Sequence, residues 1–243
     1  MVSYNKIGNM QLKLGDLPAA LNSYQAMLDI ADRLVKSDSS NAVWRRDLSV
    51  ANEKVGQLQF DLGQANQAVM SFGTAIKIGK PPDTSEFYWR RAVAKLYAND
   101  SAGAANDAAM ALKLKPSDAY YPIWLHVART RAGQNDADEL AANAEKIDSS
   151  KWPWPIAALF LGSMSPADVR SAALSVDQQT TRAAQSCEAD FFIGFYLTEK
   201  GAQADARPLF QSAVDHCPND FIEYGAAKFE LMRLNDVHHV EAR

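Results

Sequence analysis

The chain has 243 residues, of which 47% are hydrophobic and 22% are charged, and its formal net charge is −4. This apolar content suits a packed core and argues against a disordered chain. An acidic balance disfavours a general nucleic-acid binder, which would present a basic face. No run of 18 apolar residues occurs, so no membrane-spanning helix is expected.

The N-terminal residues carry no recognisable secretory signal. The sequence Met1-Val2-Ser3-Tyr4 has neither a charged segment nor an apolar stretch. As written, the sequence therefore predicts a cytoplasmic location. A repeat already begins at Tyr4, which leaves the alternative that the chain is a fragment of a longer protein. An upstream signal would then make a periplasmic location the expectation.

Two segments in the first third of the chain repeat one another at a spacing of 48 residues. They are YNKIGNMQLKLGDLPAALNSY from Tyr4 and NEKVGQLQFDLGQANQAVMSF from Asn52. The matched small and apolar positions lie three, four or seven residues apart, which indicates helices rather than strands. Gly15 and Gly63 separate two such patterns in each copy, and glycine commonly follows a helix end. Each copy therefore predicts a helix, a tight turn and an antiparallel helix.

The long spacing predicts extended helices between the two copies. We expect the second helix to continue to about Lys36 and a polar loop to follow at 37–41. The next helix should start early, from Ala42, with Trp44 covering the end of the pair. At the turn of the first copy, Asp16 can cap the second helix.

Less regular copies follow the segment GKPPDTSE at 79–86, where Pro81 and Pro82 interrupt the helical pattern. A third copy places Asn99-Asp100 at its turn, and a fourth spans about 119–147 with its turn at Gly133. The last copy spans 187–218. A final helix, from Asp220 to Leu234, is expected to cap the array, because the last face of an open array has no neighbour.

The order of small and aromatic residues in these copies resembles the tetratricopeptide repeat. In the first copy the positions that carry the resemblance are Tyr4, Gly8, Gly15, Ala20 and Tyr24. The resemblance implies an all-α fold, a right-handed solenoid of helical hairpins with a C-terminal capping helix. The expected divisions are two long-period units at 1–80, two further units at 85–147, an irregular helical insertion at 148–186, and a unit plus capping helix at 187–235, all in one continuous solenoid.

The C-terminal half, over roughly 110–235, resembles the family of the bacterial lipoprotein NlpI. The residues that carry this resemblance are Trp152, Trp154, Ile156, Leu161-Gly162, Ser165, the 187–218 copy, Glu223-Tyr224 and Glu230-Leu231. It implies a non-catalytic adaptor of the bacterial cell envelope that holds proteases and cell-wall hydrolases. The lipidated N-terminal cysteine of that family is missing from this sequence, so the membrane anchor is not implied.

The two cysteines, Cys187 and Cys217, are expected at the start of one helix and the end of its antiparallel partner. Those ends lie side by side in a hairpin, so a disulfide is geometrically feasible. Two free thiols in a reducing compartment are the alternative. The spacing fits neither a C-x-x-C redox pair nor a metal site, so neither is expected.

Catalytic motifs are missing from the sequence, which contains no nucleophile elbow, phosphate-binding loop or metalloprotease signature. We therefore expect no catalytic residues and no cofactor. His238-His239 is interpreted as a frayed polar tail. Trp152 and Trp154 are interpreted as pinning a linker against neighbouring helices, with a ligand platform as the alternative.

A partner-binding groove is predicted from the repeat register, in which positions five, six, nine and thirteen of each unit face the concave side. The predicted groove residues are Asn5, Asn9, Lys13, Lys54, Gln57, Trp89, Arg90 and Tyr97. Lys6, Glu53, Asp61 and Val93 share these register positions. An alternative is that all these residues only solvate the inner face.

Two kinds of recognition are open at this groove. Trp89 and Tyr97 would be aromatic anchors for a protein surface. Asn9, Lys54 and Arg90 could instead donate to a carboxylate. Two features argue against carboxylate binding. Asn5 stands where the repeat family has its key lysine, and Glu53 and Glu86 add opposing charge.

The sequence thus predicts an adaptor that binds a protein or peptide and has no chemistry of its own. Nucleic acid is not an expected partner, and a homo-oligomer is possible. The alternatives are a regulatory or sensor module of a larger protein and a scaffold that self-associates through its N-terminal helix edge. An enzyme is the least favoured class.

Overall fold

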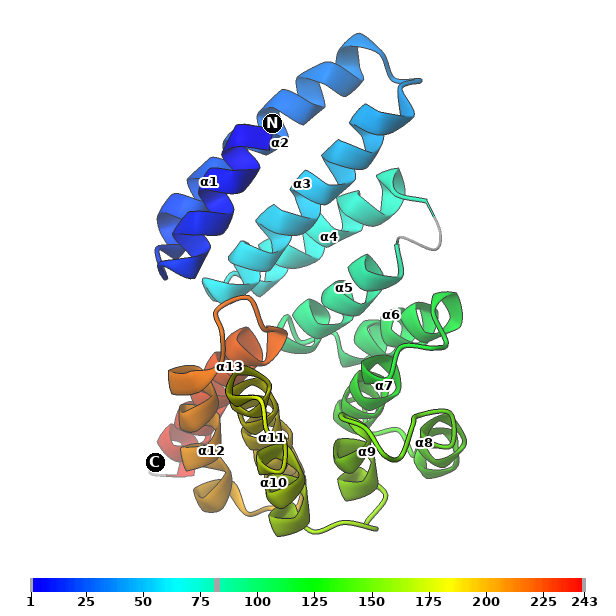
Figure 1. Ribbon diagram of the computed structural model, residues 1–243, viewed down its shortest axis with the longest axis vertical. Helices are drawn as coiled ribbons and strands as arrows, with labels where there is room; N and C mark the ends of the chain where they lie inside the picture. Colours follow the sequence, from blue (N-terminus) through cyan, green and yellow to red (C-terminus); the bar gives the residue numbers. More distant parts are fainter. Residues whose placement is uncertain (1, 81–83, 242–243) are drawn as a thin grey trace. The chain divides into compact units, whose positions relative to one another are not determined.

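The computed structural model describes the backbone of residues 2–80 and 84–241 and the side chains of these ranges up to residue 235. Within the described residues every regular element is a helix, and thirteen helices are present (Figure 1). The expectation of an all-α fold is confirmed. Pro81 and Pro82 lie outside the described residues. The chain divides into two compact units, Met1–Gln134 and Asn135–Arg243.

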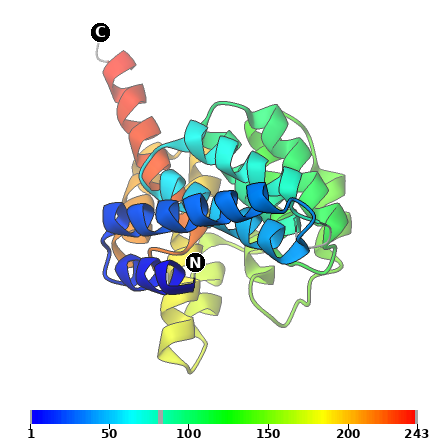
Figure 2. The same cartoon turned by 90° about the horizontal axis from the view of Figure 1, so that it is seen from above.

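The first unit is a series of helical hairpins. Its helices are α1 (Val2–Lys13), α2 (Leu17–Ser37), α3 (Ala42–Asp61), α4 (Ala65–Ile78), α5 (Ser85–Tyr97), α6 (Ser101–Leu114) and α7 (Tyr120–Arg131). Each helix packs on the next, and the first helices of successive pairs, α3, α5 and α7, also touch one another. Figure 2 shows α1 and α2 lying side by side. This is the series of antiparallel helical hairpins that the repeat pattern of the sequence predicts.

The predicted boundaries of the first two pairs agree closely with the structure. Helix α2 ends at Ser37 and α3 begins at Ala42, so the extension and the early start are both confirmed. Asp16 caps α2 by accepting from the backbone N–H of Ala19 at 3.1 Å. Asn41 caps α3 in the same way through the N–H groups of the two residues that follow Ala42.

Tight turns join the helices of each pair. Gly15 and Gly63 have φ values of 78° and 80° in these turns, and Asn99 has a φ of 62° in the third. Glycine adopts this left-handed region without a steric penalty, and asparagine is one of the few other residues that tolerate it.

A glycine on the first helix faces an aromatic ring on the second in three hairpins. The pairs are Gly8 with Tyr24, Gly56 with Phe72, and Gly194 with Phe210. A Cβ atom added at Gly56 would lie 2.9 Å from Cε1 of Phe72, which is closer than real Cβ atoms approach. All three rings are buried, with at most 1% of their surface exposed. The absence of a side chain on one helix therefore makes room for the ring of the other.

The third hairpin, formed by α5 and α6, has no glycine–ring pair. Ala92 and Ala108 occupy the two matching positions, and both are buried. No ring is present there, and a charged contact links the helices instead. Arg91 of α5 donates to both carboxylate oxygens of Asp107 on α6, at 2.7 and 2.8 Å. Lys95 lies 2.9 Å from the same carboxylate, so three charges tie α5 to α6.

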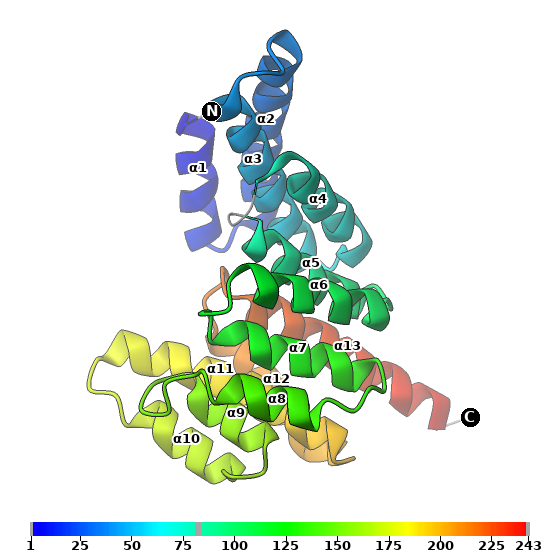
Figure 3. The same ribbon diagram turned by 90° about the vertical axis from the view of Figure 1, so that its right-hand side faces the viewer.

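The second unit begins with short helices and ends with long ones. Its helices are α8 (Ala137–Ala144), α9 (Trp154–Phe160), α10 (Pro166–Leu174), α11 (Gln179–Glu199), α12 (Gln203–His216) and α13 (Ile222–Glu241). Figure 3 shows α10 and α11 as a hairpin. Helix α13 packs on α12 and is the C-terminal capping helix.

Two predicted boundaries in this unit are wrong. Helix α11 begins at Gln179, so Cys187 lies within the helix and not at its start. Helix α13 begins at Ile222 and continues to Glu241, whereas the sequence suggested Asp220 to Leu234. Only Val237 and Val240 are apolar in the stretch 235–241, and the sequence analysis interpreted its polar residues as a frayed tail. The side chains of His238-His239 lie outside the described residues.

The arrangement of the predicted units stays a prediction. The fourth predicted copy supplies α7 to the first unit and α8 to the second. The segment 148–186 contributes α9, α10 and the first part of α11. Whether all the hairpins form one continuous solenoid therefore rests on the repeat pattern of the sequence.

The two cysteines are joined in the structure. Cys187 on α11 and Cys217 after α12 form a disulfide with a Cα–Cα distance of 5.1 Å. The turn near Gly201 lies about midway between them in the sequence, so an antiparallel hairpin brings the two residues opposite one another. The bond closes a loop over a sequence separation of 30 residues.

The tryptophan segment is attached to the core of the second unit. The indole N–H of Trp152 donates to Oε2 of Glu188 on α11 at 2.6 Å. Phe160 of α9 lies with its ring centroid 6.3 Å from that of Phe192 and 6.2 Å from that of Phe195. These contacts support the interpretation of Trp152 as a structural pin.

The glycine–ring contact predicts opposite effects for two glycines in one hairpin. Gly56→Ala should lower the free energy of unfolding by about 1–3 kcal/mol, because the new methyl group overlaps the ring of Phe72. Gly73→Ala, in α4, should raise it by up to about 1 kcal/mol, because alanine favours the helix and its Cβ would meet Arg91 only at 3.5 Å. Urea unfolding followed by circular dichroism measures both. Equal effects at the two positions would contradict the packing argument.

The disulfide predicts a stability difference that depends on reduction. Replacing both Cys187 and Cys217 by alanine should lower the free energy of unfolding by roughly 3–4 kcal/mol, as expected for a loop of this length. Reductant should shift the unfolding midpoint of the wild type towards that of the variant and leave the variant unchanged. An equal response of the two proteins to reductant would show that the bond does not stabilise the fold.

Candidate functional site

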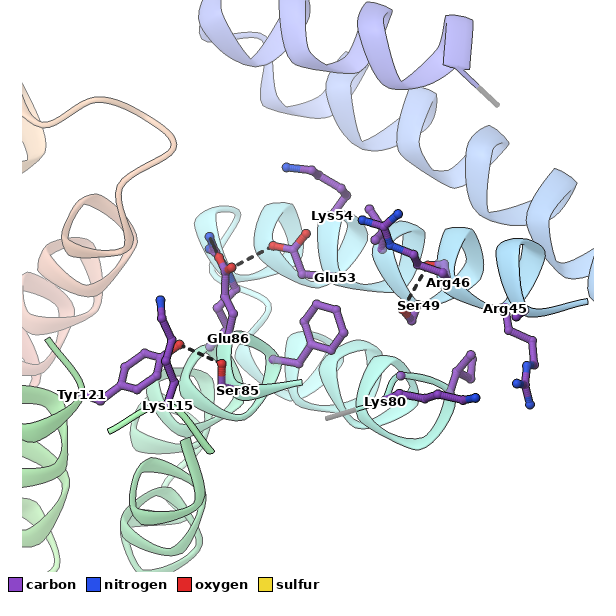
Figure 4. Close-up of a pocket in the computed structure, with 16 residues that line it drawn as sticks. Arg45, Arg46, Ser49, Glu53, Lys54, Lys80, Ser85, Glu86, Lys115 and Tyr121 are labelled. Atoms are coloured by element: carbon purple, nitrogen blue, oxygen red, sulfur yellow. Dashed lines mark hydrogen bonds and ion pairs between the residues drawn. The ribbon is translucent and has the colours of Figure 1, made fainter. Parts of the chain in front are cut away.

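A pocket of about 780 Å³ opens in the first unit. Its walls come from the N-terminal two thirds of α3, the end of α4, the start of α5, the residue that follows α6 and the start of α7 (Figure 4). The charged residues that line it are Arg45, Arg46, Glu53, Lys54, Lys80, Glu86, Arg90 and Lys115. Among the described residues, the lining thus includes six cations and two carboxylates, in a chain whose overall charge is negative.

Helix α3 forms the longest wall because its side chains recur on one face. Arg45, Ser49 and Glu53 are spaced by four residues, and Arg46, Val50 and Lys54 form a neighbouring row with the same spacing. Residues four apart lie above one another on a helix. The early start of α3 at Ala42 therefore adds two turns of basic and polar side chains ahead of the repeat register.

Arg90 is the centre of an ion-pair cluster that joins α3 to α5. Its Nε atom lies 3.1 Å from a carboxylate oxygen of Glu53, and its Nη2 atom donates to Glu86 at 2.8 Å. A third donor, Nη1, bonds to the side-chain oxygen of Gln57. Gln57 in turn donates to the buried carboxylate of Asp61 at 2.9 Å.

The charge of Arg90 is stabilised within this cluster. Burial alone would lower the pKa of the Arg90 guanidinium, but Glu53 and Glu86 more than offset this and raise its pKa above the ordinary value. Arg90 is therefore a permanent cation. Its donors are already engaged, and it is shared by two carboxylates, so this corner of the pocket carries no excess positive charge.

Tyr121 and Lys115 line the pocket on the same side as Glu86 (Figure 4). The hydroxyl of Tyr121 lies 3.4 Å from Oγ of Ser85. Burial is the main cause that raises the pKa of Tyr121, so the phenol stays neutral near neutral pH. Lys115 pairs with Asp118 at 2.7 Å, and this hydrogen bond is the main cause of its raised pKa. Neither residue offers a free charge to a ligand.

The remaining four cations of the pocket have no charged partner. Arg45, Arg46, Lys54 and Lys80 make no ion pair and no side-chain hydrogen bond within the part of the chain that the structure describes. Arg46 and Lys80 are exposed, whereas Arg45 and Lys54 are half-buried. The Nε atom of Arg45 is itself buried without a hydrogen-bond partner. The available positive charge is thus concentrated along α3 and at the end of α4.

The structure brings together only part of the predicted groove. Lys54 and Arg90 line the pocket, and Gln57 lies behind Arg90. Asn5, Asn9 and Lys13 on α1 do not line it. Asn9 is engaged by the hydroxyl of Tyr24 at 2.5 Å, Asn5 is half-buried and Lys13 is exposed.

The two predicted aromatic anchors pack between helices of the first unit. The ring of Trp89 lies 5.9 Å from that of Tyr121 and 6.5 Å from that of Trp124, centroid to centroid. The ring of Tyr97 lies 5.8 Å from that of Phe60. Both anchors are half-buried. Their use by a partner stays a prediction.

Several pocket residues were missed by the sequence reasoning. Arg45, Arg46 and Ser49 precede the aligned start of the second copy at Asn52, so the repeat register did not include them. Lys80 and Lys115 lie at helix ends that the register treats as connections. The signal that could have found the first two is the Arg45-Arg46 pair at four-residue spacing from Ser49, Val50, Glu53 and Lys54.

No group of three or more histidine, cysteine, aspartate or glutamate residues in the described part of the chain is placed to hold a metal ion. Among the described helices, none combines the length and the apolar character that a membrane span requires.

No known protein-family profile matches the chain. A tetratricopeptide repeat protein from Parabacteroides merdae has a similar solved structure, with 12% sequence identity and a TM-score of 0.42. The match covers 94% of this chain and 98% of that protein.

The Arg90 cluster predicts a stability effect that depends on its partner. Arg90→Met should lower the free energy of unfolding by about 3 kcal/mol, because Glu53 would be left buried without its cation. Adding Glu53→Gln to this variant should restore part of the loss. Arg46→Met, at an exposed and unpaired position, should change stability by less than about 0.5 kcal/mol. Urea unfolding compares the four proteins. No recovery in the double variant would show that the ion pair is not the cause.

Proposed function

We propose that this protein is a non-catalytic adaptor that binds a segment of another polypeptide in the pocket of its first unit. The observation that carries the proposal is the pocket itself, which combines several cations with apolar side chains on a frame of packed helices. A cavity of this size accommodates several side chains. Because the hairpins hold the lining side chains in place, little order is lost when a segment binds.

The chemistry of the pocket favours binding over catalysis. Both carboxylates are paired with Arg90, and the phenol of Tyr121 is held neutral. A general base needs an available carboxylate or imidazole near the reacting group. The described residues that line the pocket include neither a histidine nor a cysteine. The adaptor proposal therefore accounts for the residues of the pocket without assigning a catalytic reaction to them.

The bacterial cell envelope is the setting that we propose. The resemblance of the C-terminal half to the NlpI family supports it. The disulfide between Cys187 and Cys217 supports it as well, because such bonds persist in oxidising compartments. In that setting the adaptor would hold an envelope protein through the first unit.

Self-association is a second candidate function, favoured by the exposed face of α1. On this helix Val2, Ile7 and Met10 are 70%, 47% and 66% exposed, and Leu14, directly after the helix, is 79% exposed. Multi-angle light scattering separates the two functions. A stable dimer that is lost in a Met10→Lys, Leu14→Lys variant would favour the scaffold, and a monomer would favour the adaptor.

The adaptor proposal predicts that partners cross-link to the first unit. The purified chain, with a lysine-reactive cross-linker, is incubated with bacterial envelope extract and the products are mapped by mass spectrometry. We expect one or more polypeptides linked to Lys54, Lys80 or Lys115, enriched over a control that lacks the chain. If nothing is enriched, or if the links fall only in the second unit, the proposal is wrong.

A further inference from the structure

We propose that the pocket recognises an acidic segment, one that carries carboxylates next to an apolar side chain. This inference rests on the proposed function and names the chemistry of the partner. It follows from three observations: the unpaired cations, the buried donor of Arg45, and the apolar side chains between them.

The charge balance of the pocket comes first. Of the six cations, Arg90 is held by Glu53 and Glu86, and Lys115 is held by Asp118. Arg45, Arg46, Lys54 and Lys80 remain without a charged partner in the described part of the chain. Four like charges around one pocket repel one another, so a ligand that brings negative charge relieves this repulsion.

The guanidinium of Arg45 gives the second argument. Its Nε atom is shielded from solvent yet has no acceptor. A buried donor that is left unpaired is unfavourable, and most such donors in proteins have a partner. A carboxylate is the acceptor that matches a guanidinium best, because the two planar groups can form parallel hydrogen bonds. Figure 4 shows Arg45 and Lys80 at one end of the pocket, away from Tyr121 and Lys115.

The apolar side chains of the lining give the third argument. Val50, Ile78 and Phe87 contribute to the same pocket, and Phe87 is only 8% exposed. A small inorganic anion would leave this surface unused. An acidic segment with an apolar residue such as leucine satisfies the cations and covers the apolar side chains together.

A polypeptide fits these features better than nucleic acid does. Nucleic-acid binding normally relies on a basic stripe that follows a chain of phosphates. Here the net charge of the protein is −4, and the unpaired cations of the pocket surround a single cavity of about 780 Å³. The acidic overall charge would repel a long polyanion outside the pocket.

Titration with defined peptides tests the inference. The probe is a fluorescein-labelled pool of ten-residue peptides in which Glu, Asp and Leu occur in random order, and binding to the full chain is followed by anisotropy. The reference pool has Gln and Asn in place of Glu and Asp. We expect the acidic pool to bind at least roughly tenfold more tightly than the reference pool, and to weaken as salt is added.

Charge reversal locates the binding. The double variant Arg46→Glu, Lys54→Glu should lose roughly tenfold or more in affinity for the acidic pool. The matched control is Arg33→Glu, Lys113→Glu, which changes the net charge equally at exposed positions outside the pocket. The affinity of this control variant for the acidic pool should stay within about twofold of that of the wild type. Because none of the four side chains has a partner in the described residues, circular dichroism spectra and unfolding midpoints should be alike.

Three results would overturn the inference: equal binding of both pools, equal losses in the two double variants, or tighter binding of a single-stranded oligonucleotide of matched charge. The failure of this inference can be told apart from the failure of the adaptor proposal. Cross-linked partners on the first unit, together with equal binding of both pools, would keep the adaptor and reject the acidic chemistry. Lack of any cross-linked partner, together with selective binding of the acidic pool, would reject the adaptor and leave a pocket that selects acidic peptides.

Discussion

The close approach of paired helices is the constraint on which the rest of this protein depends. In three hairpins the approach is possible because a glycine on one helix leaves room for a buried ring on the other, as Gly56 does for Phe72. The hairpin of α5 and α6 has no such pair. Ala92 and Ala108 occupy the matching positions there, and the bidentate contact between Arg91 and Asp107 links the two helices. Because helices packed this closely cannot shift freely, the side chains between pairs hold fixed positions, and a pocket can be built on them.

The lengthened period of the first two hairpins has a functional consequence. Extra residues allow α3 to start at Ala42, so that Arg45 and Arg46 extend the wall that Glu53 and Lys54 begin. The ion pairs of Arg90 then divide the pocket into a neutralised corner and a region of unpaired cations. A feature that looks like an irregularity of the repeat thereby supplies the charge on which the proposed recognition rests.

Much of the fold could be predicted from the sequence, and less of the site. The 48-residue spacing located α1 to α4 closely, because helix periodicity and the turn glycines Gly15 and Gly63 are local signals. The start of α11 was missed because a polar first turn has no apolar pattern. At the site, Lys54 and Arg90 were named in advance. The engagement of Arg90 with Gln57 was not, since a hydrogen bond between residues 33 positions apart has no local signature.

The sequence by itself determined the class of fold and the hairpin turns, because both depend on residues at fixed short spacings along the helices. Only the tertiary structure decided which cations are neutralised and which remain available. Charge pairing depends on the distance between atoms on different helices, and the sequence does not contain that distance. For the same reason the pocket between α3, α5 and the α6–α7 segment became visible only when the helices were placed.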